Sequence, residues 1–200
     1  MRLRLAQLYG GLVLYGVSSS LLVLAGLGLD PWNVFHQGLA RHTPLAIGTW
    51  AILVGVAVLL LWIPLRQRPG IGTLSNVVVV GGTMDLLLGH VHAPHALSVR
   101  IAFLVCGVFL NGVATGAYIG AGLGPGPRDG LMTGLAARGH SIRVVRTGLE
   151  LTVLATGWLL GGTVGVGTVL YALSIGPLAH VFVPFFARGA PTPEHALEAV

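Results

Sequence analysis

Three ionisable residues interrupt an otherwise apolar run: Arg143, Arg146 and Glu150 within Ile142–Leu160. Because helical residues advance about 100° each, these side chains fall within about 60° of one helix face. Glu150 follows Arg146 by four residues, the spacing at which helical side chains can pair. Charge inside a membrane helix is costly unless it faces other protein. The spacing therefore predicts an inward-facing Arg146–Glu150 pair that serves as a gate or a coupling pair, with Arg143 as the better candidate to contact a substrate anion. All three are counted among the predicted substrate-binding residues.

A second pair of charges, Arg128 and Asp129, ends the glycine- and proline-rich segment Gly122–Asp129, which resembles Gly26–Asn33 earlier in the chain. In both segments glycines end the preceding helix and a proline fits the first position of a new one. The free N–H groups of such a helix start can hold an anion, and Arg128 adds a full positive charge. We therefore count Arg128 and Asp129 among the predicted substrate-binding residues.

Each of these segments leads into about a dozen residues of mixed polarity, at about 31–42 and about 127–140. Helices of this length cannot span a bilayer, and they suit a re-entrant or interfacial position. Asp30 fits the N-cap of the first short helix. The alternative is a pair of connectors lying flat on the membrane, with Trp32 as an interface anchor. The duplication at corresponding positions favours a transporter binding site.

Asp85 and His180 occupy equivalent places in two further apolar runs. A buried carboxylate and a titratable imidazole can serve a proton-coupled cycle, so both are candidate coupling residues. The alternative is that each satisfies a neighbouring backbone group. This structural role is favoured for His180, and both alternatives stay open for Asp85.

The sequence predicts no enzyme, no catalytic residue and no cofactor. The tract His90-Val-His-Ala-Pro-His95 lacks an acidic or cysteine ligand beside its imidazoles, so no metal site is predicted there. The glycine-rich strings lack the lysine of a P-loop, and the familiar hydrolase signatures are missing.

Composition places these residues in a membrane protein. Apolar residues make up 54% of the 200-residue chain and charged residues 8%, against about 25% charged in a soluble domain. The mean hydropathy is +0.85. The arginines are scattered rather than gathered in a basic stripe, so nucleic acid is not an expected partner. Apolar runs predict six spans, at about Leu5–Leu27, Ile47–Leu65, Ile71–Val91, Ile101–Leu123, Ile142–Leu160 and Val166–Phe186.

Arginine placement predicts the orientation of these spans, because short cytoplasmic loops carry an excess of basic residues. With the N-terminus inside, the outer loops hold only Arg41 and Arg100, and the inner segments hold the other nine of the 11 arginines. We therefore expect both termini in the cytoplasm of a bacterial cell and the chain in its inner membrane.

The chain also repeats itself. At an offset of 96 positions, Ala25-Gly-Leu-Gly28 aligns with Ala121-Gly-Leu-Gly124, and at an offset of 95, Gly70-Ile-Gly-Thr73 aligns with Gly165-Val-Gly-Thr168. Because each copy holds an odd number of spans, the second copy must enter the membrane from the opposite side, as in many transporters.

The predicted fold is therefore an all-α membrane protein of two inverted three-helix repeats, each with a short broken helix. Repeat 1 covers 1–95, repeat 2 covers 96–188, and 189–200 form a cytoplasmic tail. Gly48, Ala51 and Gly55 are the counterparts of the charged residues of Ile142–Leu160, so any binding site is chemically asymmetric.

Several motifs resemble the YczE/YyaS/YitT-type bacterial membrane proteins over about Gly10 to His180: Gly28-Leu-Asp-Pro-Trp-Asn-Val-Phe-His-Gln-Gly38, Trp62-Ile-Pro-Leu-Arg66, Gly126-Pro-Arg-Asp-Gly-Leu-Met132 and Ser141-Ile-Arg-Val-Val-Arg146. The resemblance implies a multi-span protein of the cytoplasmic membrane and supplies no substrate. Asn33 departs from the acidic residue expected at that position, which its repeat counterpart Asp129 retains.

The favoured function is transport of a small anionic or zwitterionic solute. The alternative is an accessory or scaffold protein that regulates a partner without transporting anything. The expected partners are the lipid bilayer and a small polar or anionic solute. A homodimer is also considered, mediated by Gly161-Gly162 or by the glycines of Gly107–Gly116.

Overall fold

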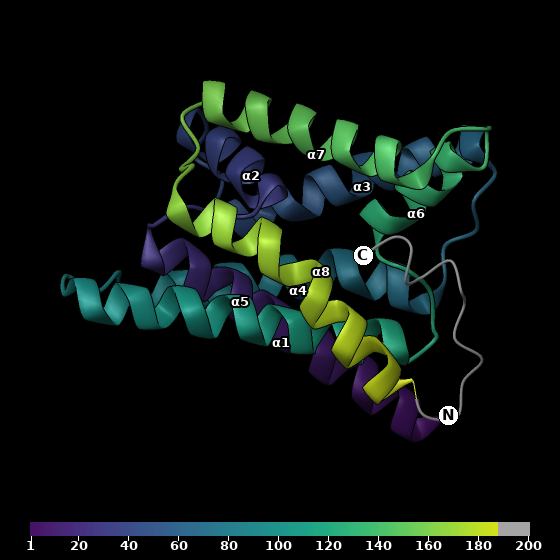
Figure 1. Ribbon diagram of the computed structural model, residues 1–200, viewed down its shortest axis with the longest axis horizontal. Coiled ribbons are helices and arrows are strands. Elements are labelled where there is room, and N and C mark those ends of the chain that lie inside the picture. Colours follow the sequence, from purple (N-terminus) through teal and green to yellow (C-terminus); the bar gives the residue numbers. More distant parts are fainter. Residues whose placement is uncertain (188–200) are drawn as a thin grey trace.

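The computed structural model describes residues 1–187 as an all-helical protein (Figure 1). Its eight helices follow the predicted order of long and short elements. They are α1 (Arg2–Ala25), α2 (Pro31–Arg41), α3 (Ile47–Leu65), α4 (Ile71–His90), α5 (Leu97–Gly120), α6 (Pro127–Ala136), α7 (Ile142–Leu159) and α8 (Val166–Phe186). The predicted tail 189–200 and Arg188 lie outside the described residues.

Five of these helices, α1, α3, α4, α5 and α8, are long and apolar enough to cross a membrane. Their outward surfaces carry large apolar side chains such as Leu60, Val78, Val105 and Leu173, which are 54–71% exposed. Such a surface fits contact with lipid rather than water. Five of the six predicted spans therefore correspond to helices that are long and apolar enough to cross a membrane. α7 is not among them because Arg143, Arg146 and Glu150 lower its hydropathy, and its crossing stays a prediction.

The helices form two groups of four (Figure 1). α1 packs on α4 and α5, and α5 packs on α8. In the other group, α2 packs on α3 and α7, and α6 packs on the same two helices. α4 joins the groups through α3 and α6. The two short helices therefore lie inside the second group, and the segments that lead into them face the first.

The segments before α2 and α6 make matching backbone contacts. Gly167 donates its N–H to the carbonyl of Leu27, and Gly72 donates to Leu123, both at 2.8 Å. Gly28 and Gly124 have φ values of +117° and +121°, a region that other residues rarely adopt. Glycine is needed there both for the backbone turn and for the close approach of the neighbouring helix start.

The glycines considered for dimer contacts pack inside the chain. A Cβ at Gly162 would lie 2.2 Å from the carbonyl oxygen of Val34, and one at Gly107 would lie 2.9 Å from Leu22. Gly112 and Gly116 are similarly close to Leu178 and Phe182 of α8. These glycines thus serve helix packing within one chain, and dimerisation stays a prediction.

Gly28→Ala is expected to destabilise the fold by about 1–3 kcal/mol because of its strained backbone. The new Cβ would lie 2.7 Å from the backbone nitrogen of Gly165. The control is Gly82→Ala, since a Cβ at Gly82 meets nothing within 4 Å. Thermal unfolding in detergent should show a lower midpoint for G28A only, and equal midpoints for the two variants would contradict the tight contact.

Candidate functional site

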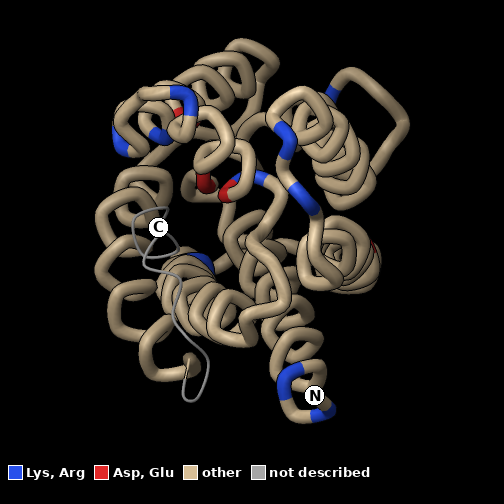
Figure 2. Tube along the Cα trace, turned by 90° about the vertical axis from the view of Figure 1, so that its right-hand side faces the viewer, with Lys and Arg blue, Asp and Glu red and all other residues tan. Residues whose placement is uncertain are grey.

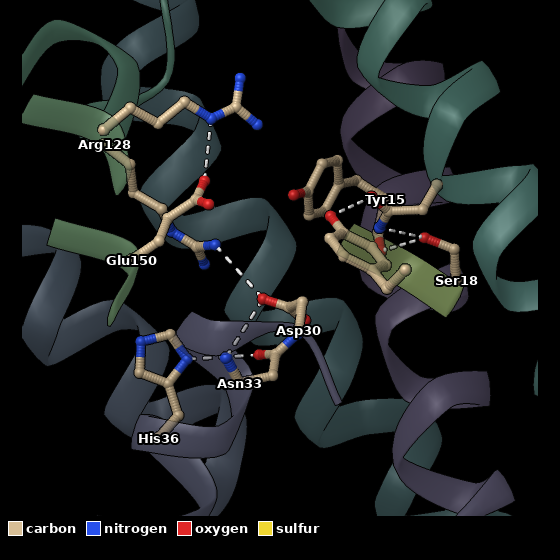
Figure 3. Close-up of polar contacts among 10 residues, drawn as sticks. Tyr15, Ser18, Asp30, Asn33, His36, Arg128 and Glu150 are labelled. Atoms are coloured by element: carbon tan, nitrogen blue, oxygen red, sulfur yellow. Dashed lines mark hydrogen bonds and ion pairs between the residues drawn. The ribbon is translucent and has the colours of Figure 1, made fainter. Parts of the chain in front are cut away.

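The first turns of α2 and α6 meet in the interior of the protein. Asp30 is the N-cap of α2 and accepts a hydrogen bond from the backbone N–H of Asn33 at 3.2 Å, as predicted. Pro31 and Pro127 begin the two helices. Arg128 lies within 3.8 Å of the Asp30 carboxylate, and its guanidinium stands 4.9 Å from the centre of the Trp32 ring. These contacts join the start of one short helix to the start of the other (Figure 3).

Arg128 is weakly held compared with the other charged groups nearby. A separation of 3.8 Å is too long for a hydrogen bond, so its contact with Asp30 is electrostatic. Among the described residues, its guanidinium donates no hydrogen bond. Its side chain is 27% exposed. The five N–H donors of Arg128 are therefore available to a carboxylate or another planar anion.

Asp129 follows Arg128 in the sequence, and one of its carboxylate oxygens, Oδ2, is held by two hydrogen bonds. Its carboxylate accepts hydrogen bonds from the Tyr118 hydroxyl at 2.8 Å and from the backbone N–H of Gly126 at 3.1 Å. In the first repeat the acid stands at the N-cap, as Asp30, and an amide, Asn33, stands where the second repeat has Asp129. Each short helix thus begins with one carboxylate, at positions three residues apart.

α7 supplies the remaining charged groups. Arg146 donates from Nε to a Glu150 carboxylate oxygen at 3.0 Å, so the predicted pairing is confirmed. Both side chains are partly exposed, at 22% and 34%. Arg146 and Glu150 line the same space as Arg128, so the pair closes one side of it.

A cavity of about 80 Å³ brings these groups together. Its wall contains three carboxylates, two guanidinium groups and four aromatic rings, from the side chains Asp30, Asp129, Glu150, Arg128, Arg146, Trp32, Tyr15, Tyr118 and Tyr171. Figure 2 likewise shows acidic and basic positions meeting in the interior of the protein. We call this space the charged cavity. It combines both signs of charge with aromatic faces and hydroxyls, which suits recognition of a small polar molecule.

Comparison with known proteins assigns the chain to a family. Residues 3–184 match the model of a family described as a family of unknown function, DUF6198. The chain belongs to this family. It is 44% identical to an uncharacterized protein of Haemophilus influenzae, over 88% of this chain and 82% of the other. It is also similar to two Bacillus subtilis proteins, the uncharacterized membrane protein YczE (35%, covering 91% and 86%) and the uncharacterized protein YyaS (30%, covering 90% and 92%).

The resemblance to YczE and YyaS is therefore confirmed, together with the character of a bacterial membrane protein. No solved structure matches the chain. Because the family is one of unknown function, the charged cavity of this DUF6198 chain has to be interpreted from its own residues.

α2 and α6 are too short to cross a membrane, and burial alters the acid–base chemistry of two residues on them. Burial raises the pKa of Asp129, against the opposing effects of the Tyr118 hydrogen bond and the nearby Arg128 and Arg146. Burial lowers the pKa of His36 well below its usual value, and Arg128 lowers it further. His36 is consequently neutral at neutral pH.

The other residues predicted from sequence lie away from the charged cavity. Arg143 is exposed and does not line it. Asp85 accepts hydrogen bonds from the backbone N–H of Gly48 and the hydroxyl of Thr49, both at 2.6 Å, and so holds the start of α3. His180 is exposed on α8. The structure therefore brings together Arg128, Asp129, Arg146 and Glu150, and leaves Arg143, Asp85 and His180 outside.

Sequence reasoning missed several residues of the site. The sequence favours Trp32 as an interface anchor under one alternative, but its side chain is only 6% exposed and lies under Arg128. Tyr15 and Tyr118, which line the charged cavity from α1 and α5, gave no signal because isolated tyrosines in apolar runs are common. The sequence predicts Asp30 only as a helix cap, although its place in the duplicated motif, two residues before Trp32, is a signal that it belongs to the site.

Asp30→Ala is expected to lower the free energy of unfolding by about 1–3 kcal/mol, because it removes a helix cap and a buried acceptor. Asp30→Asn is the matched variant, since it keeps an oxygen that can cap α2 but loses the charge beside Arg128. Thermal unfolding should place D30N between D30A and the unmodified chain. A D30A midpoint equal to that of the unmodified chain would show that the cap contributes nothing.

Proposed function

We propose that this protein transports a small anionic or zwitterionic solute across the bacterial cytoplasmic membrane. The observation that carries the proposal is the charged cavity, where ionisable groups of both signs face one space between the two short helices. Ionisable side chains are rare in membrane segments and usually mark a solute or ion pathway. An accessory protein would not require such a cavity.

The chemistry of the cavity suggests how the solute is held. Arg128 has unused N–H donors and takes the carboxylate or other anionic group of the solute. Glu150 and Asp30 lie in the same wall and can accept a hydrogen bond from an ammonium group. This combination favours a zwitterion over a simple anion. Because Arg146 and Glu150 pair with each other, they are the groups that would separate when a solute enters or leaves.

An inverted repeat would give this cavity access to both sides of the membrane. Three observations support it. The contacts of α1 with α4 and of α2 with α7 have counterparts in those of α5 with α8 and of α6 with α3. The hydrogen bond from Gly167 to Leu27 has its counterpart in the one from Gly72 to Leu123, with donor and acceptor in opposite copies each time. Thr73 and Thr168 each accept the N–H of the glycine that caps their helix, at 3.2 Å.

The first test compares two arginines in purified protein reconstituted into liposomes, with radiolabelled amino acids and small carboxylates as the panel. Arg128→Ala should weaken binding and uptake of the accepted solute roughly 10- to 100-fold, the effect of losing one charge-assisted hydrogen bond. Arg143→Ala is the matched control, because Arg143 is exposed and outside the charged cavity. Absence of binding and flux across the panel would favour the accessory function instead.

The second test concerns orientation. Pro44 and His140 are exposed residues in corresponding loops, 96 positions apart. In a Cys106→Ser background, a membrane-impermeant maleimide should label Pro44→Cys in intact cells and His140→Cys only after permeabilisation. Labelling of both positions from the same side would contradict the inverted repeat.

A further inference from the structure

A second cavity lies beside the charged one. It has a volume of about 30 Å³ and is bounded by α2, α3, α4 and α6. Trp32 and Arg128 line both cavities, so their stack forms a common wall. No carboxylate is found among the described residues that line the second cavity. Its polar side chains are Arg128, Asn76 and His36.

The two cavities correspond through the repeat. Trp32 is itself the counterpart of Arg128, and other wall residues pair as His36 with Met132, Ala51 with Arg146, Gly55 with Glu150, Asn76 with Tyr171 and Val80 with Ile175. Small residues in the second cavity thus stand where the charged cavity has the Arg146–Glu150 pair. The same position in the fold is charged in one half and uncharged in the other.

The orientation of His36 is defined by a chain of hydrogen bonds (Figure 3). Asn33 donates its side-chain amide to the Asp30 carboxylate, which turns its carbonyl oxygen toward His36. His36 Nδ1 lies 3.3 Å from that oxygen and must be the donor, because a carbonyl only accepts. In a neutral imidazole the other nitrogen, Nε2, then carries a lone pair.

Among residues 1–187, His36 Nε2 finds no hydrogen-bond partner, although the residue is only 1% exposed. A buried acceptor without a partner is costly and uncommon in native structures. Since His36 lines the second cavity, a hydrogen-bond donor placed there would satisfy it. Asn76 stands in the same wall and offers a second polar contact.

We infer that the second cavity is a subsite for an uncharged hydrogen-bond donor of the solute, such as a hydroxyl, which His36 Nε2 accepts. Arg128 holds the anionic group of the same solute at the boundary between the cavities. The subsite rests on the proposed function, and it adds a preference for small hydroxy-substituted acids over the same acids without the hydroxyl. The absence of carboxylates explains why this half-site selects a neutral group.

The test uses the full chain in lipid nanodiscs, with L-serine against L-alanine and glycolate against acetate as probes. The hydroxylated member of a pair should bind roughly 3- to 10-fold more tightly, as expected for one added hydrogen bond. Long-range ¹H–¹⁵N spectra should show His36 protonated at Nδ1 alone, with an Nε2 resonance that moves on adding serine or glycolate. Alanine and acetate should leave it in place.

His36→Met places in α2 the residue that the second repeat has at this position, and it should abolish the preference for the hydroxyl while keeping alanine binding. His180→Met is the control, because His180 is exposed on α8. Equal affinities within both pairs, or an unmoved Nε2 resonance, would overturn the subsite. Tight, hydroxyl-selective binding without flux in liposomes would instead overturn transport and leave the subsite standing.

Discussion

Charge inside an apolar helix bundle has to be partnered, and the rest of this structure is arranged around that requirement. Desolvating an ion costs several kcal/mol, so a buried pair by itself is weak support for stability. Here Asp129 is held by a tyrosine and a backbone amide, and Glu150 by Arg146. Within the described part of the chain, Arg128 has a long ion pair and an aromatic face and no hydrogen bond. This imbalance leaves the Arg128 guanidinium able to bind a ligand.

Non-helical backbone near these charges creates a second requirement, because lipid cannot hydrogen-bond to exposed amides. The backbone groups of the loops before α2 and α6 are instead paired by hydrogen bonds to residues at or near the starts of distant helices. Leu29 donates to the carbonyl of Thr163, whose own N–H reaches the Gln37 side chain. On the other side, Thr73 donates to the carbonyl of Pro125. Both loops are thus supported by the opposite repeat, which holds the first turns of α2 and α6 together.

The two similar halves of the sequence differ in their chemistry. In α2 the acidic residue is the N-cap, Asp30, and in α6 it lies three residues further on, as Asp129. Both short helices therefore begin with a carboxylate, but the two carboxylates have different partners. Asp30 forms an ion pair with Arg128 and orients Asn33, whereas Asp129 accepts a hydrogen bond from the Tyr118 hydroxyl. The charged cavity and the second cavity thereby lie on the two sides of the Trp32–Arg128 stack, and the described lining of the second cavity carries no carboxylate.

The sequence by itself determined the order of the helices and most of their ends. Apolar run length and the glycine and proline positions act locally, so α3, α4, α7 and α8 match the predicted segments within about one residue, whereas α1 and α5 begin three to four residues earlier than predicted. The Arg146–Glu150 pair and the Asp30 cap were likewise predictable, because three- and four-residue spacing within one helix decides them. Tertiary structure alone decided which charges meet. Arg128 rather than Arg143 lines the charged cavity, Asp85 holds the start of α3, and His36 is buried in the wall of the second cavity, because these outcomes depend on which helix face a neighbour covers.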